Sequence, residues 1–148
     1  MKKLIPILTA LLLATLFACN QKPVKKQATA DFRFEEYTIA QLQQGYDNGD
    51  FTVTGVVQAY LDCIEAIDDS GPMLNAVIQV NPDALAIAAQ LDTELKEGKK
   101  RGPMHGVPVL LKDNIDTHDQ METTAGSRAL SGSYPLQDSY IAMKLREA

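Results

Sequence analysis

The stretch that decides the fold runs from Gly102 to Leu130 and reads GPMHGVPVLLKDNIDTHDQMETTAGSRAL. Within it, the apolar residues 107–111 have the length and β-branched content typical of a strand buried on both faces. Lys112 follows this strand directly. A lysine is costly to bury unless it is paired or loses its proton. Lys112 is therefore predicted to reach solvent, to pair with a carboxylate, or to be buried as a neutral amine that can act as a general base.

Three segments of this stretch resemble the first signature block of the amidase signature family. They are GPMHGVP at residues 102–108, LKDNIDT at 111–117 and TTAGS at 123–127. Members of that family hydrolyse carboxamides with a Ser-Ser-Lys triad, and the lysine of their K-D-N segment corresponds to Lys112. The residues alone favour a structural ion pair between Lys112 and Asp113 or Asp116. The resemblance favours the catalytic role instead.

The resemblance also implies two serines in a downstream glycine- and serine-rich block. None of the candidate serines lies in a Gly-x-Ser-x-Gly or Gly-Ser-Ser-Gly context; they are Ser127, Ser131, Ser133 and Ser139. We therefore assign no nucleophile, interpret residues 32–148 as the N-terminal part of an amidase domain, and expect this fragment alone to be inactive. The alternative hypothesis is a lipid-anchored, non-enzymatic module that uses an amidase scaffold for binding or assembly.

The residues after Lys112 are typical of turns. Asp113 and Asn114 are expected to support the loop through hydrogen bonds to the backbone. Three hydroxyl side chains could line the triad or satisfy the backbone of a turn at Gly126, and we favour the turn; they are Thr123, Thr124 and Ser127.

Metal and cofactor chemistry is not indicated. His105 and His118 lie thirteen positions apart, without clustered Cys, Asp or Glu at metal-ligand spacing. We interpret His105 as a packed loop residue and His118 as a solvated one. The sequence contains no phosphate-binding glycine loop or dinucleotide fingerprint, so no cofactor is expected.

The N-terminus predicts export. Residues 1–18 combine Lys2 and Lys3 with an apolar run too short to span a membrane, as in a secretory signal peptide. Cys19 follows in a context that resembles a lipobox, so we predict that it is lipidated; an ordinary signal peptide cleaved near Ala18 is the alternative. Residues 19–31 are a predicted flexible tether. These features predict a lipid anchor at the extracytoplasmic face of a bacterial cell envelope.

Composition limits the partners. The net charge of −5 argues against nucleic acid as a partner. The resemblance implies a small-molecule or peptide amide as substrate, and residues 74–78 and 81–85 are most similar to the exported peptide-amidase-like branch. Cys63 is interpreted as a packing residue.

The elements alternate along the chain. The spacing of apolar residues predicts helices from Thr38, over 53–67, over 82–97 and after a capping Asp138, with strands at 74–80 and 107–111. This order predicts an α/β fold, the N-terminal portion of the amidase signature fold, with a mixed, mostly parallel sheet covered by helices.

Overall fold

The computed structural model describes residues 32–148. The predicted signal peptide, the lipidated Cys19 and the tether lie outside the described residues, so they stay predictions. In the described part, the main helices are α2 (Ile39–Asn48), α3 (Val53–Cys63), α4 (Ala84–Lys96) and α5 (Tyr140–Glu147). Two short helices complete the set, the π-helix η1 (Ile64–Asp69) and the 3-10 helix η2 (Arg128–Leu130). No helix in this range is long and apolar enough to cross a membrane.

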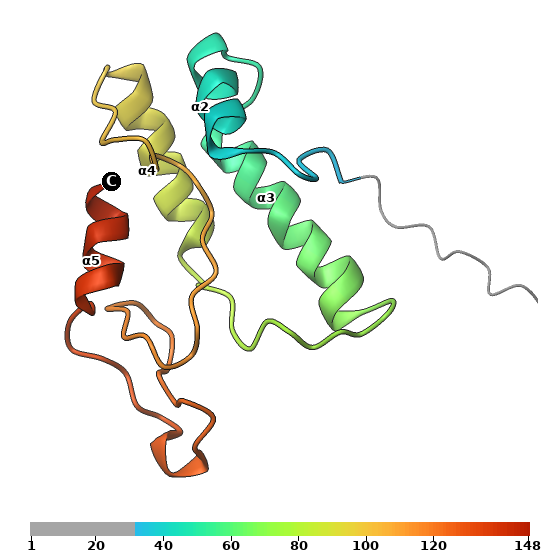
Figure 1. Cartoon of the computed structure of the whole chain (residues 1–148), viewed down its shortest axis with the longest axis vertical. Helices are drawn as coiled ribbons and strands as arrows, with labels where there is room; N and C mark the ends of the chain where they lie inside the picture. The colour runs from blue at the N-terminus through green and yellow to red at the C-terminus, as the bar shows by residue number, and fades with distance from the viewer. Residues whose placement is uncertain (1–31) are drawn as a thin grey trace, which may run out of the picture.

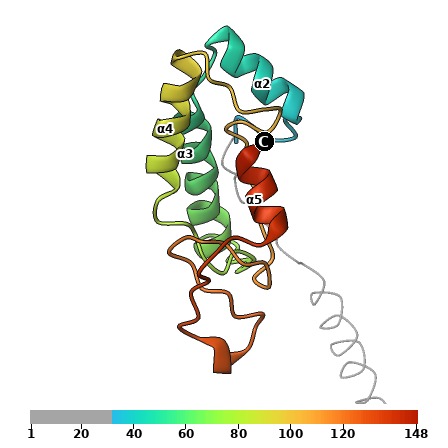
Figure 2. The ribbon, with the colours of Figure 1, turned by 90° about the vertical axis from the view of Figure 1, so that its left-hand side faces the viewer.

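The helices form a body from which the remaining chain extends. Helices α3 and α4 pack along each other, and α2 lies across one end of them (Figure 1). Residues 113–137 extend beyond the opposite end, as both views show (Figure 2). The chain then returns through α5, whose last residue meets the segment after α4, since the amide of Met104 donates to the carbonyl oxygen of Ala148 at 3.1 Å.

The helix boundaries follow the local sequence. Thr38 and Gln41 form the predicted capping box at the start of α2, and Gly49 ends that helix with φ 75°. The predicted second helix is confirmed as α3 continued by η1. The predicted caps of the last two helices need correction. Asn81 accepts from the amide of Asp83 and α4 begins only at Ala84, whereas α5 is capped by Ser139 and not by Asp138.

The predicted sheet is not confirmed, because residues 32–148 contain no β-strand. Residues 74–80 and 107–111 have irregular structure, and their apolar side chains are exposed, as Ile78 at 69% and Leu110 at 79% show. A strand is stable only when its backbone groups pair with a neighbouring strand. Neither segment finds such a neighbour within the described residues, so the prediction that residues 107–111 are buried on both faces is wrong for this part of the chain.

The core lies between α2, α3 and α4. Its buried residues are Phe34, Leu42, Tyr46, Val53, Val56 and Ala88. The ring of Phe34 packs edge-to-face against that of Phe51, with 5.0 Å between the centroids. Of the predicted inward residues of α4, Ala88 is buried and Leu91 and Leu95 pack against the core, but Leu85 is 37% exposed.

Candidate active site

Lys112 is exposed, although the sequence predicts it in a dry pocket at a strand end. Its carbonyl oxygen accepts from the amide of Ile115 at 2.9 Å, so the chain turns directly after the lysine. The described residues position the backbone of Lys112 without covering its side chain. The burial expected for Lys112 is thus not found in residues 32–148, and its catalytic role stays a prediction.

Asp113 fixes the chain next to Lys112. Its carboxylate accepts three hydrogen bonds, from the amide of Thr124 at 3.1 Å, from Thr124 Oγ1 at 2.5 Å and from the amide of Gly126 at 3.2 Å. Its carbonyl oxygen accepts a fourth, from the amide of Ala125 at 3.0 Å. The hydrogen bonds from Thr124 lower the pKa of Asp113, because they stabilise the charged form. We call this set of contacts the Asp113 latch.

The turn bound by Asp113 is conformationally unusual. Ala125 and Gly126 have φ of 50° and 75°, in the left-handed region that disfavours residues with a Cβ atom. Thr124 Oγ1 also accepts from the amide of Gly126 at 3.2 Å. The role favoured from sequence for Thr124, satisfying the backbone of the Gly126 turn, is confirmed. The amide of Ser127 donates to the carbonyl oxygen of Thr124 at 2.8 Å, which closes the same turn.

His105 anchors the segment that leads to Lys112. It is 2% exposed, and its Nδ1 accepts from the amide of Arg101 at 3.2 Å. Nε2 must then carry the proton and donate to the carbonyl oxygen of Leu91 at 3.1 Å. The interpretation of His105 as a packed loop residue is confirmed. Its neutral form makes both bonds, so it belongs to the scaffold of the loop.

Helix α2 supplies a second anchor that the sequence analysis missed. Tyr46 Oη donates to the carbonyl oxygen of Gly106 at 2.8 Å, and Gln43 Nε2 donates to that of His105 at 2.8 Å. Burial, together with the carboxylate of Asp92, raises the pKa of Tyr46 above its usual value. Tyr46 lies on the predicted apolar face of α2, and that position alone does not reveal a partner sixty residues away.

The far end of the loop is held by charge. Arg146 on α5 contacts Asp119 at 2.6 Å and Asp138 at 2.8 Å, and the amide of His118 donates to Asp138 at 2.7 Å. Burial alone would raise the pKa of Asp138, but the bonds from His118 and Arg146 lower it overall. The side chain of His118 is exposed, as predicted. Residues 32–148 contain no group of three His, Cys, Asp or Glu side chains that could hold a metal ion.

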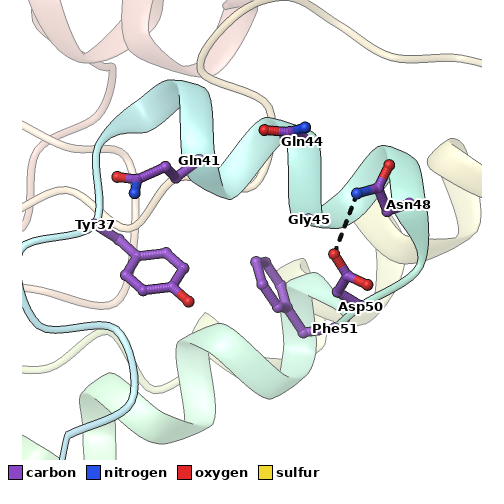
Figure 3. Close-up of a pocket in the computed structure, with 7 residues that line it drawn as sticks. All are labelled: Tyr37, Gln41, Gln44, Gly45, Asn48, Asp50 and Phe51. Atoms are coloured by element: carbon purple, nitrogen blue, oxygen red, sulfur yellow. Dashed lines mark hydrogen bonds between the residues drawn. The ribbon is translucent and has the colours of Figure 1, made fainter.

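A pocket lies on α2, apart from Lys112 (Figure 3). It is lined by Tyr37, Gln41, Gln44, Gly45, Asn48, Asp50 and Phe51. Within it, Asn48 Nδ2 donates to Asp50 at 3.3 Å, so its polar groups partly satisfy one another. The pocket contains neither Lys112 nor Asp113, and we assign it no part in the candidate site.

Comparison with known proteins gives this arrangement a family. Residues 55–148 match the family model described as Amidase. The native peptide amidase from Stenotrophomonas maltophilia is 47% identical with a TM-score of 0.75, over 78% of this chain and 23% of that chain. The peptide amidase PAM in complex with the competitive inhibitor chymostatin gives the same identity, TM-score and coverage. The glutamyl-tRNA(Gln) amidotransferase of Alkaliphilus metalliredigens has a subunit that is 38% identical over 117 residues, which are 78% of this chain and 23% of its own length.

These matches first place the structure among the proteins with the amidase signature fold, which is α/β. The chain belongs to the Amidase family, which confirms the resemblance of residues 102–127 to its signature block. It spans about a fifth of the length of the curated relatives it matches.

Proposed function

We propose that the protein is an amidase that hydrolyses the carbon–nitrogen bond of carboxamides by a Ser-Ser-Lys mechanism, with Lys112 as the proton acceptor. The observation that carries the proposal is the family match over residues 55–148, which includes the K-D-N segment at Lys112. The Asp113 latch supports it, because a catalytic lysine needs a fixed backbone on either side.

The chemistry divides into two steps. A serine oxygen bonds to the amide carbonyl carbon, and its proton passes through a second serine to the neutral amine of Lys112. The carbon–nitrogen bond then breaks as the leaving nitrogen takes a proton from the lysine, and water hydrolyses the acyl-serine to a carboxylic acid. Residues 1–148 contain no serine in the required context, so we propose that this stretch alone does not turn over amides.

The lysine must start without its proton. An exposed amine is stabilised as an ammonium by water, so a neutral Lys112 requires a drier environment than residues 32–148 provide. The matched peptide amidase structure is far longer, since this chain covers 23% of it. We propose that further parts of an amidase domain cover Lys112 in the full-length protein.

Peptide amides or small carboxamides are the proposed substrates. The support is the 47% identity to two peptide amidase structures, one of them inhibited by chymostatin. Relatives that belong to amidotransferases are 38% identical or less. The predicted signal peptide and lipidated Cys19 add the proposal of a lipid-anchored protein in the cell envelope, where tRNA-dependent amidation does not occur. Replacement of Cys19 by serine should abolish incorporation of labelled palmitate into the protein.

The experiment compares variants of the full-length protein that contains this chain. Ammonia release is measured from a C-terminally amidated dipeptide and from a simple aromatic carboxamide. Lys112→Ala should lower kcat by at least about 10²-fold, the size typical of a lost general base, with KM changed only a few-fold. Lys99→Ala is the control, because Lys99 is 71% exposed and contacts only the neighbouring Glu97.

Two results would decide against the proposal. An active Lys112→Ala variant would remove Lys112 from the mechanism. A folded wild-type protein that binds amides and releases no ammonia would favour the alternative of a non-enzymatic binding module.

A further inference from the structure

The Asp113 latch is more extensive than an ordinary turn requires. One residue accepts four hydrogen bonds from three consecutive residues, 124–126, with its carboxylate and its carbonyl oxygen. Two of the carboxylate bonds come from backbone amides, and the third comes from a hydroxyl at 2.5 Å. Hydrogen bonds to an ionised carboxylate are about twice as strong as those between neutral groups. The latch therefore binds two segments of the chain eleven residues apart.

The position of the latch relative to Lys112 is what makes it informative. Asp113 is the next residue in the chain, and the carbonyl oxygen of Lys112 is itself held by the amide of Ile115. Residues 107–111 before the lysine are irregular and lie in no strand of the described part. The contacts that fix the backbone at Lys112 therefore lie on its C-terminal side.

The latch also maintains a strained backbone. Ala125 has φ of 50°, which costs a residue with a Cβ atom roughly 1–2 kcal/mol. Strain of this kind persists only where surrounding bonds hold it, and here Asp113 receives the amides on both sides of Ala125 as well as the amide of Ala125 itself. Loss of the carboxylate should let residues 124–126 relax and shift the chain at Lys112.

We propose that Asp113 is a positioning residue for the proposed amidase reaction, acting through the Thr124–Gly126 turn to hold Lys112 where it can accept a proton. This inference rests on the proposed function of Lys112. It assigns Asp113 no contact with substrate. It predicts that the side chains of Asp113 and Thr124 affect turnover and not substrate affinity.

The test uses the full-length protein that contains this chain and a matched pair of aspartate variants. Asp113→Asn keeps the size of the side chain but presents an NH₂ group where one oxygen accepted. Asp116→Asn makes the same change at an exposed aspartate three residues away. For each we measure kcat and KM for an amidated dipeptide, the melting temperature, and deuterium exchange of peptides within residues 121–130.

Asp113→Asn should lower kcat by about 10²-fold, the loss typical of a catalytic group displaced by about 1 Å. KM should change less than about threefold. Exchange within residues 121–130 should accelerate. Asp116→Asn should match the wild type in all of these measurements.

Thr124 provides a second pair of variants that stays informative where Asp113→Asn fails to fold. Thr124→Val removes the hydroxyl bonded to Asp113 and should lower kcat about tenfold, the value of one hydrogen bond. Thr124→Ser keeps the hydroxyl and should restore wild-type kcat. This rescue distinguishes loss of the latch from a general effect of substitution in the loop.

The outcomes separate the two proposals. An active wild type whose Asp113→Asn and Thr124→Val variants retain full kcat overturns the positioning role alone. A kcat loss that disappears well below the melting temperature of the variant also overturns it, because unfolding then caused the loss. An inactive wild-type protein overturns the proposed function and the positioning role together.

Discussion

The helical body, residues 32–69 and 84–106, and the loop region, residues 107–138, are stabilised by different interactions. The body buries apolar side chains from three helices, among them Leu42, Val53 and Val56. In the loop region the one buried residue is the polar Thr117, while Leu110 and Leu136 are 79% and 92% exposed. The loop keeps its shape through carboxylates, chiefly those of Asp113 and Asp138.

The difference has a consequence for function. Apolar packing is cooperative and tolerates little displacement, so the body can serve as a rigid support. A loop held by side-chain hydrogen bonds opens more easily, because each bond contributes only about 1 kcal/mol net. The two regions meet at His105 and Gly106, which are buried in the body directly before the chain leaves it toward Lys112. Positioning of the proposed catalytic lysine therefore depends on this junction and on the Asp113 latch.

The largest effect should come from the body. Leu42 is 3% exposed, and Leu42→Ala should lower the free energy of unfolding by about 3 to 4 kcal/mol, because it leaves a cavity in a packed core. Leu110→Ala makes the same change at a side chain that is 79% exposed and should cost less than about 0.5 kcal/mol. Urea denaturation followed by helical circular dichroism measures both. Equal losses at the two positions would contradict the contrast between the regions.

A second pair of variants tests the junction. Gly106 has φ of 72°, and a Cβ atom there would lie 2.6 Å from Val53 Cγ2. Gly106→Ala should therefore cost about 2 to 3 kcal/mol, from backbone strain and from overpacking. Gly98 has the same φ of 72° with nothing within 4 Å, so Gly98→Ala should cost only the strain, about 1 kcal/mol. The difference in unfolding free energy between the two variants isolates the close packing at the junction; no difference would remove it.

The hydroxyl of Tyr46 tests the same junction more gently. Tyr46→Phe removes the buried 2.8 Å hydrogen bond to the carbonyl oxygen of Gly106 and keeps the ring in the core. The expected loss is about 1 kcal/mol of unfolding free energy, together with faster deuterium exchange just after Gly106. Tyr140→Phe is the control, since Tyr140 is 73% exposed. A Tyr46→Phe variant as stable as the control would show that the bond does not hold the loop.

The contrast also explains what the sequence could predict. Helix α2 is encoded locally, by the capping box of Thr38 and Gln41 and the left-handed Gly49, and these were predicted correctly. The role of Thr124 in the Gly126 turn was predicted for the same reason. Strands at 74–80 and 107–111 were predicted from composition, yet a strand needs a partner, and the described residues supply none.

Contacts between distant residues were beyond reach. Asp92 binds the amides of Val53 and Thr54 at 2.7 and 3.0 Å, and so caps α3 from another helix. Nothing near Asp92 in the sequence indicates that partner. The exposure of Lys112 was missed for a related reason, because a buried strand end was inferred from five apolar neighbours whose own partners were unknown. Local caps and turns are readable from one sequence, whereas pairings across the fold are not.

The smallest expected effect concerns pH and an ion pair at the edge of the body. Hydrogen bonds from Arg101 lower the pKa of Glu94 to about 2, from a usual 4.5. A carboxyl whose pKa is depressed in the folded state stabilises the fold above its unfolded pKa, and this contribution disappears as pH falls from 4.5 toward 2. The urea midpoint of the wild type should therefore fall over this range more steeply than that of Glu94→Gln. Glu97→Gln is the control, because Glu97 pairs only with Lys99 across a solvent-exposed contact. Wild type and Glu94→Gln with parallel pH profiles would show that the pair contributes nothing to the body, and would leave apolar packing as its main support.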